Sequence, residues 1–224
     1  MKIFVITRFS YLAPNYLNKW ANNSIEELKK KVFNKNRLKK RFSAFKKITY
    51  PSIINQSYNN WMWFIITSKF LPEEYKNKLK SLINNNSKIK VIFSENIPQK
   101  QGSGFHNYKN YIIESENYAT VRLDDDDGIN HNLFKHLQQY DKKTLTDKFI
   151  SFPLGQKFTI KNDKIILGSK HNEKKIALGL TRINNYVYRG EHNKIHDSRI
   201  IFDYLPDSYY LFCDSSTYTN RKFF

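Results

Sequence analysis

Cysteine is almost absent from this chain of 224 residues, in which Cys213 is the single thiol. One thiol forms no intrachain disulfide, and it supplies no cysteine pair for a zinc site. Long apolar runs are absent too. The run that opens the chain is interrupted by Arg8, and no later run approaches the ~20 residues of a membrane span. We therefore expect a protein of a reducing compartment, located in the cytoplasm, with one compact core.

Acidic residues are few. Asp and Glu number 20 against 38 Lys and Arg, so the formal net charge is +18 and the pI is near 9.7. Residues 29–47 hold ten of the basic residues and no acid. This balance favours an anionic partner such as nucleic acid, an anionic membrane surface or a phosphorylated ligand. A mutational bias toward A/T-rich codons explains the same abundance of Lys, Asn, Ile, Tyr and Phe, and both interpretations stay open.

Short apolar runs alternate with amphipathic segments over the first 140 residues. We expect strands at 2–7, 61–67, 88–93 and 118–123, and helices from Ser24, at 37–48 ending before Pro51, at 71–83, at 107–115 and near 130–140. This alternation is typical of an α/β fold with a mostly parallel sheet. Later segments are short strands, including a hairpin that turns at Asn162-Asp163. The C-terminal half is therefore expected to be mixed and partly antiparallel.

The acids that are present gather at one point, because four consecutive aspartates, Asp124 to Asp127, directly follow the strand expected at 118–123. In open α/β sheets, ligands bind beyond the carboxyl ends of the strands. Carboxylates about 7 Å apart repel by roughly 2 kcal/mol per pair at an effective dielectric of about 20. The row therefore favours a hard cation, Mg²⁺ or Mn²⁺, held together with a substrate diphosphate. A solvated acidic loop at a helix start is the structural alternative. A two-metal phosphohydrolase or nuclease is a third, for which no further converging acids are identified.

Five segments, in their order and spacing, resemble the glycosyltransferase A-fold enzymes and, more narrowly, the putative rhamnosyltransferase family. They are TRFSY (7–11), RFSAFKKITYPSIINQSYNNWMWFIITS (41–68), LPEEYKNKL (71–79), VRLDDDDGI (121–129) and FPLG (152–155). The resemblance implies one Rossmann-like glycosyltransferase A-type domain over 1–224, with helices on both faces of its sheet. Residues 1–128 would be its nucleotide-sugar-binding half and 129–224 its acceptor-side half. The implied activity is the metal-dependent transfer of rhamnose or another hexose from a nucleotide-activated donor to a glycan or lipid-linked acceptor.

The same resemblance gives roles to the aspartates. Asp124 and Asp126 would form the Asp-x-Asp pair, with Asp127 completing an Asp-x-Asp-Asp pattern. Asp124 would face the nucleotide ribose or a metal-bound water, and Asp126 would bind the Mn²⁺ or Mg²⁺ that bridges the donor diphosphate. Asp125 would point to the opposite side if the backbone stays extended, so we expect it to be solvated or to cap a helix.

Thr7, Arg8 and Phe9 follow the first strand, where this fold normally receives the nucleotide base. Arg8 can contact phosphate or base in bidentate fashion and Phe9 can stack on a base, although core packing is the alternative for Phe9. Lys109 stands where related enzymes often carry an Arg-Asn pair near the donor. Its glycine-containing surroundings fit no P-loop pattern.

A later polar segment, YRGEHNKIHDSR (188–199), supplies the remaining candidates. His192 best matches the histidine that often completes the metal site in this fold, and a surface histidine is its alternative. An inverting transfer needs a general base within hydrogen-bond reach of the acceptor hydroxyl, and Glu191 and Asp197 are the nearest acids in sequence.

The basic run suggests two further possibilities. As a transferase, the protein would make peripheral contact with an anionic membrane through residues 29–47, at the inner face of a membrane. The competing function is a nucleic-acid-binding protein that uses Lys, Arg and Tyr, with a purely structural acidic loop. We expect nucleic acid to be the less favoured partner, because the acidic row and the five segments fit a transferase.

Overall fold

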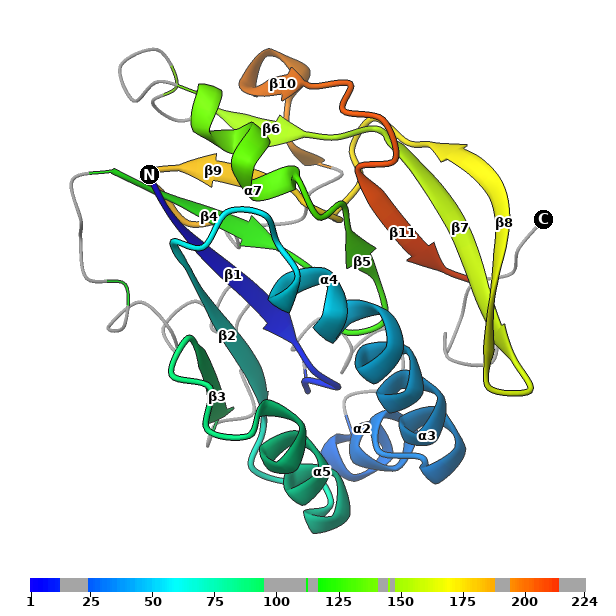
Figure 1. Cartoon of the computed structure of the whole chain (residues 1–224). Helices are drawn as coiled ribbons and strands as arrows, with labels where there is room; N and C mark the ends of the chain where they lie inside the picture. The colour runs from blue at the N-terminus through cyan, green and yellow to red at the C-terminus, as the bar shows by residue number, and fades with distance from the viewer. Residues whose placement is uncertain are drawn as a thin grey trace.

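The computed structural model describes residues 1–12, 24–94, 112, 117–140, 145, 148–187 and 194–213 (Figure 1). Its larger sheet has seven strands in the order β10-β6-β9-β4-β1-β2-β3. Strands β1 to β4 are parallel neighbours, β9 runs antiparallel to both β4 and β6, and β10 is parallel to β6. The predicted α/β fold with a mostly parallel sheet is confirmed. The strands are β1 (Lys2–Arg8), β2 (Trp61–Ser68), β3 (Ile89–Ser94), β4 (Tyr118–Arg122), β6 (Phe149–Ser151), β9 (Thr181–Ile183) and β10 (Ile200–Phe202).

A second sheet of four strands lies beside the first, in the order β5-β11-β7-β8. Its strands are β5 (Gly128–Ile129), β7 (Leu154–Lys161), β8 (Lys164–Asn172) and β11 (Tyr209–Phe212). Strands β7 and β8 form the predicted hairpin. Asn162 and Asp163 both have positive φ, 47° and 66°, as a two-residue type I′ turn requires. The prediction of a mixed, partly antiparallel C-terminal half is confirmed.

The helix expected at 37–48 is longer than predicted. It begins as α3 (Lys35–Ala44), widens into a π-helical turn over Phe45–Thr49 and continues as α4 (Tyr50–Ile54). The prediction that it ends before Pro51 was wrong. A proline normally clashes with the carbonyl four residues earlier, but here the Tyr50 amide bonds to the carbonyl of Phe45, five residues back. This wider turn lets the helix pass through Pro51.

Most of the other helices begin and end where their capping residues indicate. Ser24 caps α2 by accepting a hydrogen bond from the Glu27 amide, and Pro72 precedes the two glutamates that open α5. The helix expected near 130–140 is present but short, as α7 (Leu133–His136) followed directly by a 3₁₀ turn over Leu137–Gln139. The expected helix at 107–115 falls mostly outside the described residues. The remaining helical elements are α2 (Ile25–Val32), α5 (Glu73–Ile83), α7 (Leu133–His136), and the 3₁₀ turns Leu137–Gln139 and Asp197–Arg199.

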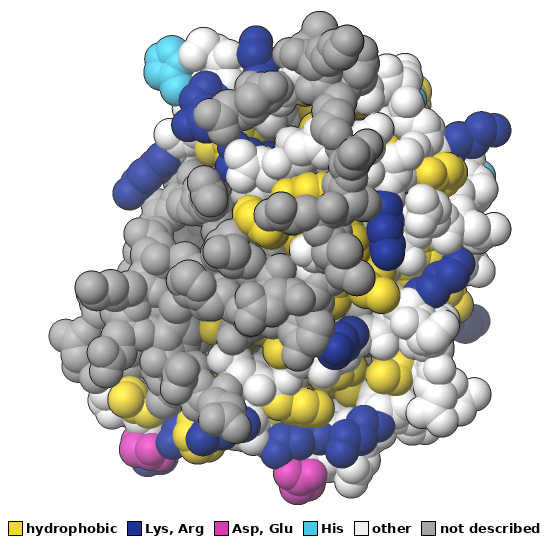
Figure 2. All heavy atoms as spheres, turned by 90° about the vertical axis from the view of Figure 1, so that its left-hand side faces the viewer, with side chains coloured by type: hydrophobic (Ala, Val, Ile, Leu, Met, Phe, Trp, Pro, Cys, Tyr) yellow, Lys and Arg dark blue, Asp and Glu magenta, His cyan; other side chains and the backbone are white. Residues whose placement is uncertain are grey.

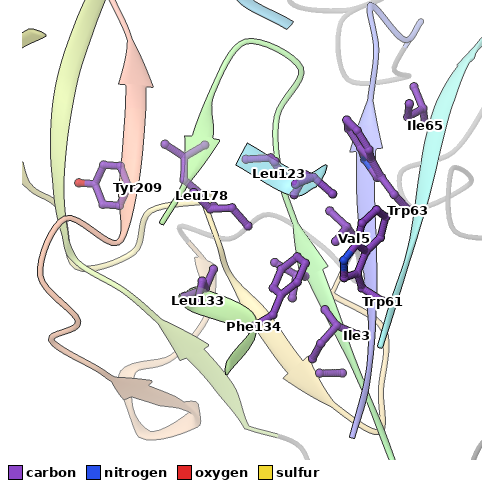
Figure 3. Packing of buried hydrophobic residues seen from close by; sticks show 14 of the residues in the cluster. Ile3, Val5, Trp61, Trp63, Ile65, Leu123, Leu133, Phe134, Leu178 and Tyr209 are labelled. Carbon is purple, nitrogen blue, oxygen red and sulfur yellow. The ribbon is translucent and has the colours of Figure 1, made fainter. Parts of the chain in front are cut away.

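The core lies on both faces of the larger sheet, because successive side chains of β1 point to opposite sides. Ile3 and Val5 pack in one cluster with Trp61 and Trp63, while Phe4 packs in the other. Figure 3 shows the first cluster, in which side chains of α7 and β11 close over the strands. Buried residues of α3, α4, α5 and α7 also belong to this cluster. Helices α3, α4, α5 and α7 therefore cover one face of the sheet.

Gly155 on β7 leaves room for the ring of Tyr209 on the neighbouring strand β11. A Cβ at this position would lie 2.3 Å from the ring of Tyr209. That ring is fully buried, and its hydroxyl donates to the carbonyl of Pro153 at 3.0 Å. Tyr209 is therefore unable to give way to a larger neighbour.

We predict that Gly155→Ala lowers the free energy of unfolding by about 3 kcal/mol, because overpacking against a fixed ring strains the site. Gly168→Ala on β8 is the control, since its Cβ would meet its first neighbour at 3.4 Å. Urea denaturation of both variants measures the difference. Equal stabilities would contradict the close-packing account.

Candidate active site at the carboxyl end of strand β4

The four aspartates follow the carboxyl end of a strand of the larger sheet, as predicted from the sequence. Strand β4 sits between β1 and β9 in the larger sheet, and residues 124–127 follow its carboxyl end. The chain turns there, with the amide of Asp127 donating to the carbonyl of Asp124 at 3.4 Å, and it enters β5 of the second sheet. The aspartate row is thus the joint between the two sheets.

Arg41 on α3 neutralises part of this row. Its Nε donates to Oδ1 of Asp125 at 3.0 Å, and its Nη2 donates to Oδ1 of Asp126 at 2.7 Å and also to Oδ1 of Asp125. The side chain of Arg41 is 11% exposed and those of both aspartates are 2% exposed. One guanidinium therefore bridges two buried carboxylates through charge-assisted hydrogen bonds, which are stronger than hydrogen bonds between neutral groups. Nothing in the sequence singled out Arg41 from the ten basic residues of the run.

Asp125 is an anchor and not the solvated or capping residue that we expected. Besides Arg41, its Oδ2 accepts a hydrogen bond from the amide of Ser10 at 2.8 Å. Ser10 follows β1 and has a positive φ of 41°. Asp125 thus ties together the ends of β1 and β4 and helix α3. The expectation failed because the chain turns after Leu123, so strand alternation does not apply there.

Asp126 has one carboxylate oxygen without a protein partner. Its Oδ1 meets Arg41, whereas its Oδ2 is buried and accepts no hydrogen bond. Burial raises the pKa of Asp126 to about 7, opposed by Arg41 and reinforced by Asp125 and Asp124. A buried acceptor without a partner is costly in a folded protein. A ligand cation or a hydrogen-bond donor at Oδ2 of Asp126 would remove that cost.

Asp127 and Asp124 differ in exposure. Asp127 is buried and accepts the amide of Phe212 in β11 at 2.7 Å, so it holds the second sheet. Burial raises the pKa of Asp127 well above its ordinary value, and Asp126 and Asp124 add to that rise. Asp124 has a side chain that is 33% exposed and 3.2 Å from Nη2 of Arg122. It is the aspartate of the row most open to a ligand.

The helix that carries Arg41 is held against the aspartate turn by close packing. A Cβ on Gly128 would lie 2.7 Å from Cγ2 of Ile48, in the π-helical turn. After the helix, the side chain of Gln56 donates to the carbonyl of Asn130 at 2.8 Å and accepts from the amide of Phe134 at 3.1 Å. The glycine after the aspartates and the glutamine of the segment 41–68 thus position the helix that neutralises the row.

The residues proposed for the nucleotide base are mostly internal. Thr7 is buried and accepts a hydrogen bond from Nε1 of Trp63 at 3.0 Å. Phe9 is buried with its ring centroid 5.2 Å from that of Phe45, an arrangement that matches the core-packing alternative. Arg8 is half-buried at the end of β1. A contact of these three residues with a base stays a prediction.

Asp197 lies far from the aspartate row. It begins the 3₁₀ turn before β10, at the edge of the larger sheet, whereas the row follows the carboxyl end of β4 three strands away. Its side chain is 65% exposed and pairs with Lys175 at 2.5 Å, which lowers its pKa. The structure does not bring Asp197 to the site, so this position gives no support to its predicted role as a base. Lys109, Glu191 and His192 lie outside the described residues.

No group of three or more His, Cys, Asp and Glu side chains is arranged to hold a metal ion among the residues that the structure describes. Binding of Mn²⁺ or Mg²⁺ by Asp126 and Asp124 therefore stays a prediction. Within the same part of the chain, no helix is long and apolar enough to cross a membrane.

Comparison with known proteins identifies the family. The model of the family "Putative rhamnosyl transferase" matches residues 2–209, so the chain belongs to that family. No curated protein sequence matches. Among solved structures, Staphylococcus aureus TarS 1–349 in complex with UDP-GlcNAc is similar, with a TM-score of 0.52 and 12% identity over 96% of this chain. TarS 1–349 in complex with UDP gives a TM-score of 0.51 and 12% identity over 97% of this chain. The chain spans about three fifths of the TarS 1–349 chain, 59% and 62% in the two structures.

We predict that Arg41→Met destabilises the protein by about 3–5 kcal/mol, because it leaves two buried carboxylates without their cation. Adding Asp125→Asn should restore part of that loss, since one of the two charges is then removed. Urea denaturation of both single variants and the double variant gives the coupling energy. Lys39→Met, at an exposed position of the same helix, is the control. An Arg41→Met variant as stable as the control would contradict the neutralising role.

A second prediction concerns pH. Because the pKa of Asp126 is raised in the folded state, the folded protein binds more protons than the unfolded chain between the ordinary value and about 7. Stability is therefore lost as pH rises through that window. Asp126→Asn should be more stable than the parent at about pH 8, by on the order of 2 kcal/mol, and nearly equal to it at about pH 4.5.

Thermal or urea denaturation at the two pH values measures this difference. Asp207→Asn, at a half-exposed aspartate outside the row, is the control for the change of side chain. If Asp126→Asn is the less stable protein at the higher pH, the charge of Asp126 is stabilising and the account of its burial fails.

Proposed function

We propose that the protein is a glycosyltransferase that moves a sugar, rhamnose or another hexose, from a nucleotide-activated donor to a glycan or lipid-linked acceptor. One observation carries the proposal. A row of four aspartates stands at the carboxyl end of a central strand, and one buried oxygen of Asp126 has no protein partner. Ligands of open α/β sheets bind at this end of the strands.

The comparisons support the class of donor. The family carries the description of a rhamnosyl transferase and covers residues 2–209, which include every aspartate of the row. The similar fold of TarS 1–349 is solved in complex with UDP-GlcNAc and with UDP. A nucleoside diphosphate sugar is therefore the ligand that we assign to this end of the sheet.

The residues present fit a divalent cation. Carboxylate oxygens are hard ligands, and Mg²⁺ and Mn²⁺ are commonly held by one or two carboxylates together with substrate phosphates. The unpartnered Oδ2 of Asp126 would offer one such oxygen, and Asp124, whose oxygens lie 3.2 and 3.4 Å from Nη2 of Arg122, would offer another. When bound, the ion would neutralise the charge that develops on the departing nucleoside diphosphate.

The protein's own groups prepare the site. Arg41 fixes Asp125 and the Oδ1 of Asp126, so a single oxygen of Asp126 is left for a ligand. Its positive charge also keeps the row from repelling the diphosphate as strongly as four bare carboxylates would. Asp124, the most accessible of the row, is assigned to the ribose or to a water on the ion.

The remaining roles follow the family resemblance. Arg8 and Lys109 are assigned to the donor and His192 to the cation. Glu191, chosen because it is the acid next to His192 in the sequence and not from the resemblance, is assigned as the base that takes the acceptor hydroxyl proton. Residues 1–128 are proposed to bind the nucleotide sugar and residues 129–224 to face the acceptor. Buried side chains from both of these parts share one cluster, which suits a single domain.

We predict that UDP, GDP or dTDP raises the melting temperature in the presence of Mn²⁺, whereas the matching nucleoside does so far less. A ligand at 100 times its Kd stabilises by about 2.7 kcal/mol. Asp126→Asn should abolish the Mn²⁺-dependent part of the shift. It should also lower sugar transfer by about a hundredfold or more, because an ion-stabilised leaving group accounts for several kcal/mol.

The shift is measured by differential scanning fluorimetry with and without EDTA, and transfer by release of the nucleoside diphosphate. Asp207→Asn should retain both the shift and the activity. Equal stabilisation by nucleoside and diphosphate, or full activity of Asp126→Asn, would overturn the proposal.

A further inference from the structure

Strand β8 presents consecutive aliphatic side chains to solvent. Ile165, Ile166 and Leu167 are 43%, 46% and 57% exposed. The strand lies at the edge of the second sheet, paired only with β7. Proteins usually blunt an exposed edge of this kind, because its unpaired backbone and apolar side chains favour association. We therefore expect a binding partner to cover this hairpin edge.

The apolar face of the hairpin is only half covered. In the β7–β8 register, Leu167 is opposite Phe158 and Ile165 is opposite Ile160, so these four side chains share a face. Phe158 packs with Ala44 and Phe212, and Ile48 and Ile160 pack around them. The helix that carries Arg41 thus covers this face over β7, while Ile165 and Leu167 continue the same face uncovered over β8.

Lysines surround the uncovered part. Lys47, in the π-helical turn, pairs with Asp163 of the hairpin turn at 2.5 Å, and Lys46 is its neighbour in the chain. The hairpin itself adds Lys157, Lys161, Lys164 and Lys170. The nearby aspartates, Asp163 and Asp207, are each paired with a lysine. By strand alternation Lys161 and Lys164 lie on the face opposite Ile165 and Leu167, so the tip of the hairpin carries aliphatic side chains and lysines together.

Positive charge alone does not select this surface. The face of the molecule beyond β3 also carries many Lys and Arg side chains (Figure 2). The other large exposed apolar residues among the described positions are single ones: Ile25, Ile54, Phe70 and Tyr204. Among the described residues, only β8 has exposed aliphatic residues at consecutive positions in the sequence, and lysines of the same hairpin flank them.

We propose that the tip of the β7–β8 hairpin, with Lys46 and Lys47, docks on an anionic lipid bilayer. Ile165 and Leu167 enter the interfacial layer from one face of the hairpin tip and Ile166 from the other, and the lysines face the lipid phosphates. Membrane-surface segments combine these features, because apolar burial and attraction to anionic lipid reinforce each other. A second copy of the chain fits less well, since it would bring the same lysines against these.

The docked hairpin would hold the aspartate row close to the membrane. Strand β7 pairs with β11, and the amide of Phe212 at the end of β11 bonds to Asp127. This arrangement suits an acceptor that is anchored in lipid. Lipid docking does not depend on the proposed function, because neither the aspartates nor a nucleotide takes part in it.

The test is sedimentation of the full chain with vesicles of phosphatidylcholine alone or mixed with phosphatidylglycerol. We expect binding to the mixed vesicles only. Ile165→Ser with Leu167→Ser should lower the partition coefficient about tenfold, because two half-exposed aliphatic side chains no longer enter the interface. Ile25→Ser with Ile54→Ser, at similar exposures elsewhere, should leave it unchanged.

A second pair of variants separates this surface from the rest of the basic run. Lys161→Gln with Lys164→Gln should weaken binding by about fivefold per lysine at low salt. A variant with Lys29, Lys30, Lys39 and Lys40 changed to Gln should weaken binding less, since these residues lie on α2 and α3 and not on the hairpin. The Mn²⁺-dependent shift with a nucleoside diphosphate, measured on the hairpin variants, reports the donor site separately.

Three results would overturn the proposal. The parent protein binds neither vesicle, or the Ile165 and Leu167 variant binds as well as its Ile25 and Ile54 control. In the third, the fourfold lysine variant on α2 and α3 loses more vesicle binding than the Lys161 and Lys164 variant. Sedimentation velocity adds a fourth. A parent that is dimeric, with a hairpin variant that is monomeric and still binds vesicles, would assign the surface to a second copy instead.

Discussion

The guanidinium of Arg41 neutralises two buried carboxylates of the aspartate row, Asp125 and Asp126. Helix α3 positions that guanidinium. Buried charges cost several kcal/mol each unless they are paired and hydrogen-bonded. Arg41 reaches Asp125 and Asp126 from α3, and the Ser10 amide donates a hydrogen bond to the other oxygen of Asp125. The π-helical turn, Gly128 and Gln56 hold that helix against the turn after β4. The row is therefore a joint between two sheets and a helix as well as a candidate site.

The excess of positive charge has two parts with different physical roles. Arg37 and Arg41, which look like any other basic residues of the run 29–47, are buried. Arg37 donates to the Val32 carbonyl at 2.7 Å, and Arg41 neutralises the aspartates. The lysines of the run remain at the surface, where Lys47 pairs with the hairpin turn. The net charge of +18 thus overstates the positive surface that the run offers to a partner.

Local pattern predicted much of the fold. The strands β1 to β4 and the hairpin turn at Asn162-Asp163 could be read from apolar runs and turn residues, because each is set by its own side chains. The passage of the helix through Pro51 could not, since it depends on a widened turn that sequence periodicity does not reveal. Arg41 was missed for a related reason: its partner lies 84 residues away. The candidate site could be placed from the sequence because the aspartates directly follow an apolar strand-like run, while its electrostatics required the three-dimensional structure.

The central claim is that Arg41 occupies Asp125 and one oxygen of Asp126 while the other oxygen is left for a cation that bridges the donor diphosphate. A crystal structure with Mn²⁺ and a nucleoside diphosphate tests it most directly, through the anomalous scattering of manganese. We predict one manganese peak about 2.1 Å from Oδ2 of Asp126 and in contact with the diphosphate, with Arg41 still bound to Asp125. A manganese peak away from Asp126, or a diphosphate bound elsewhere on the sheet, would contradict the account.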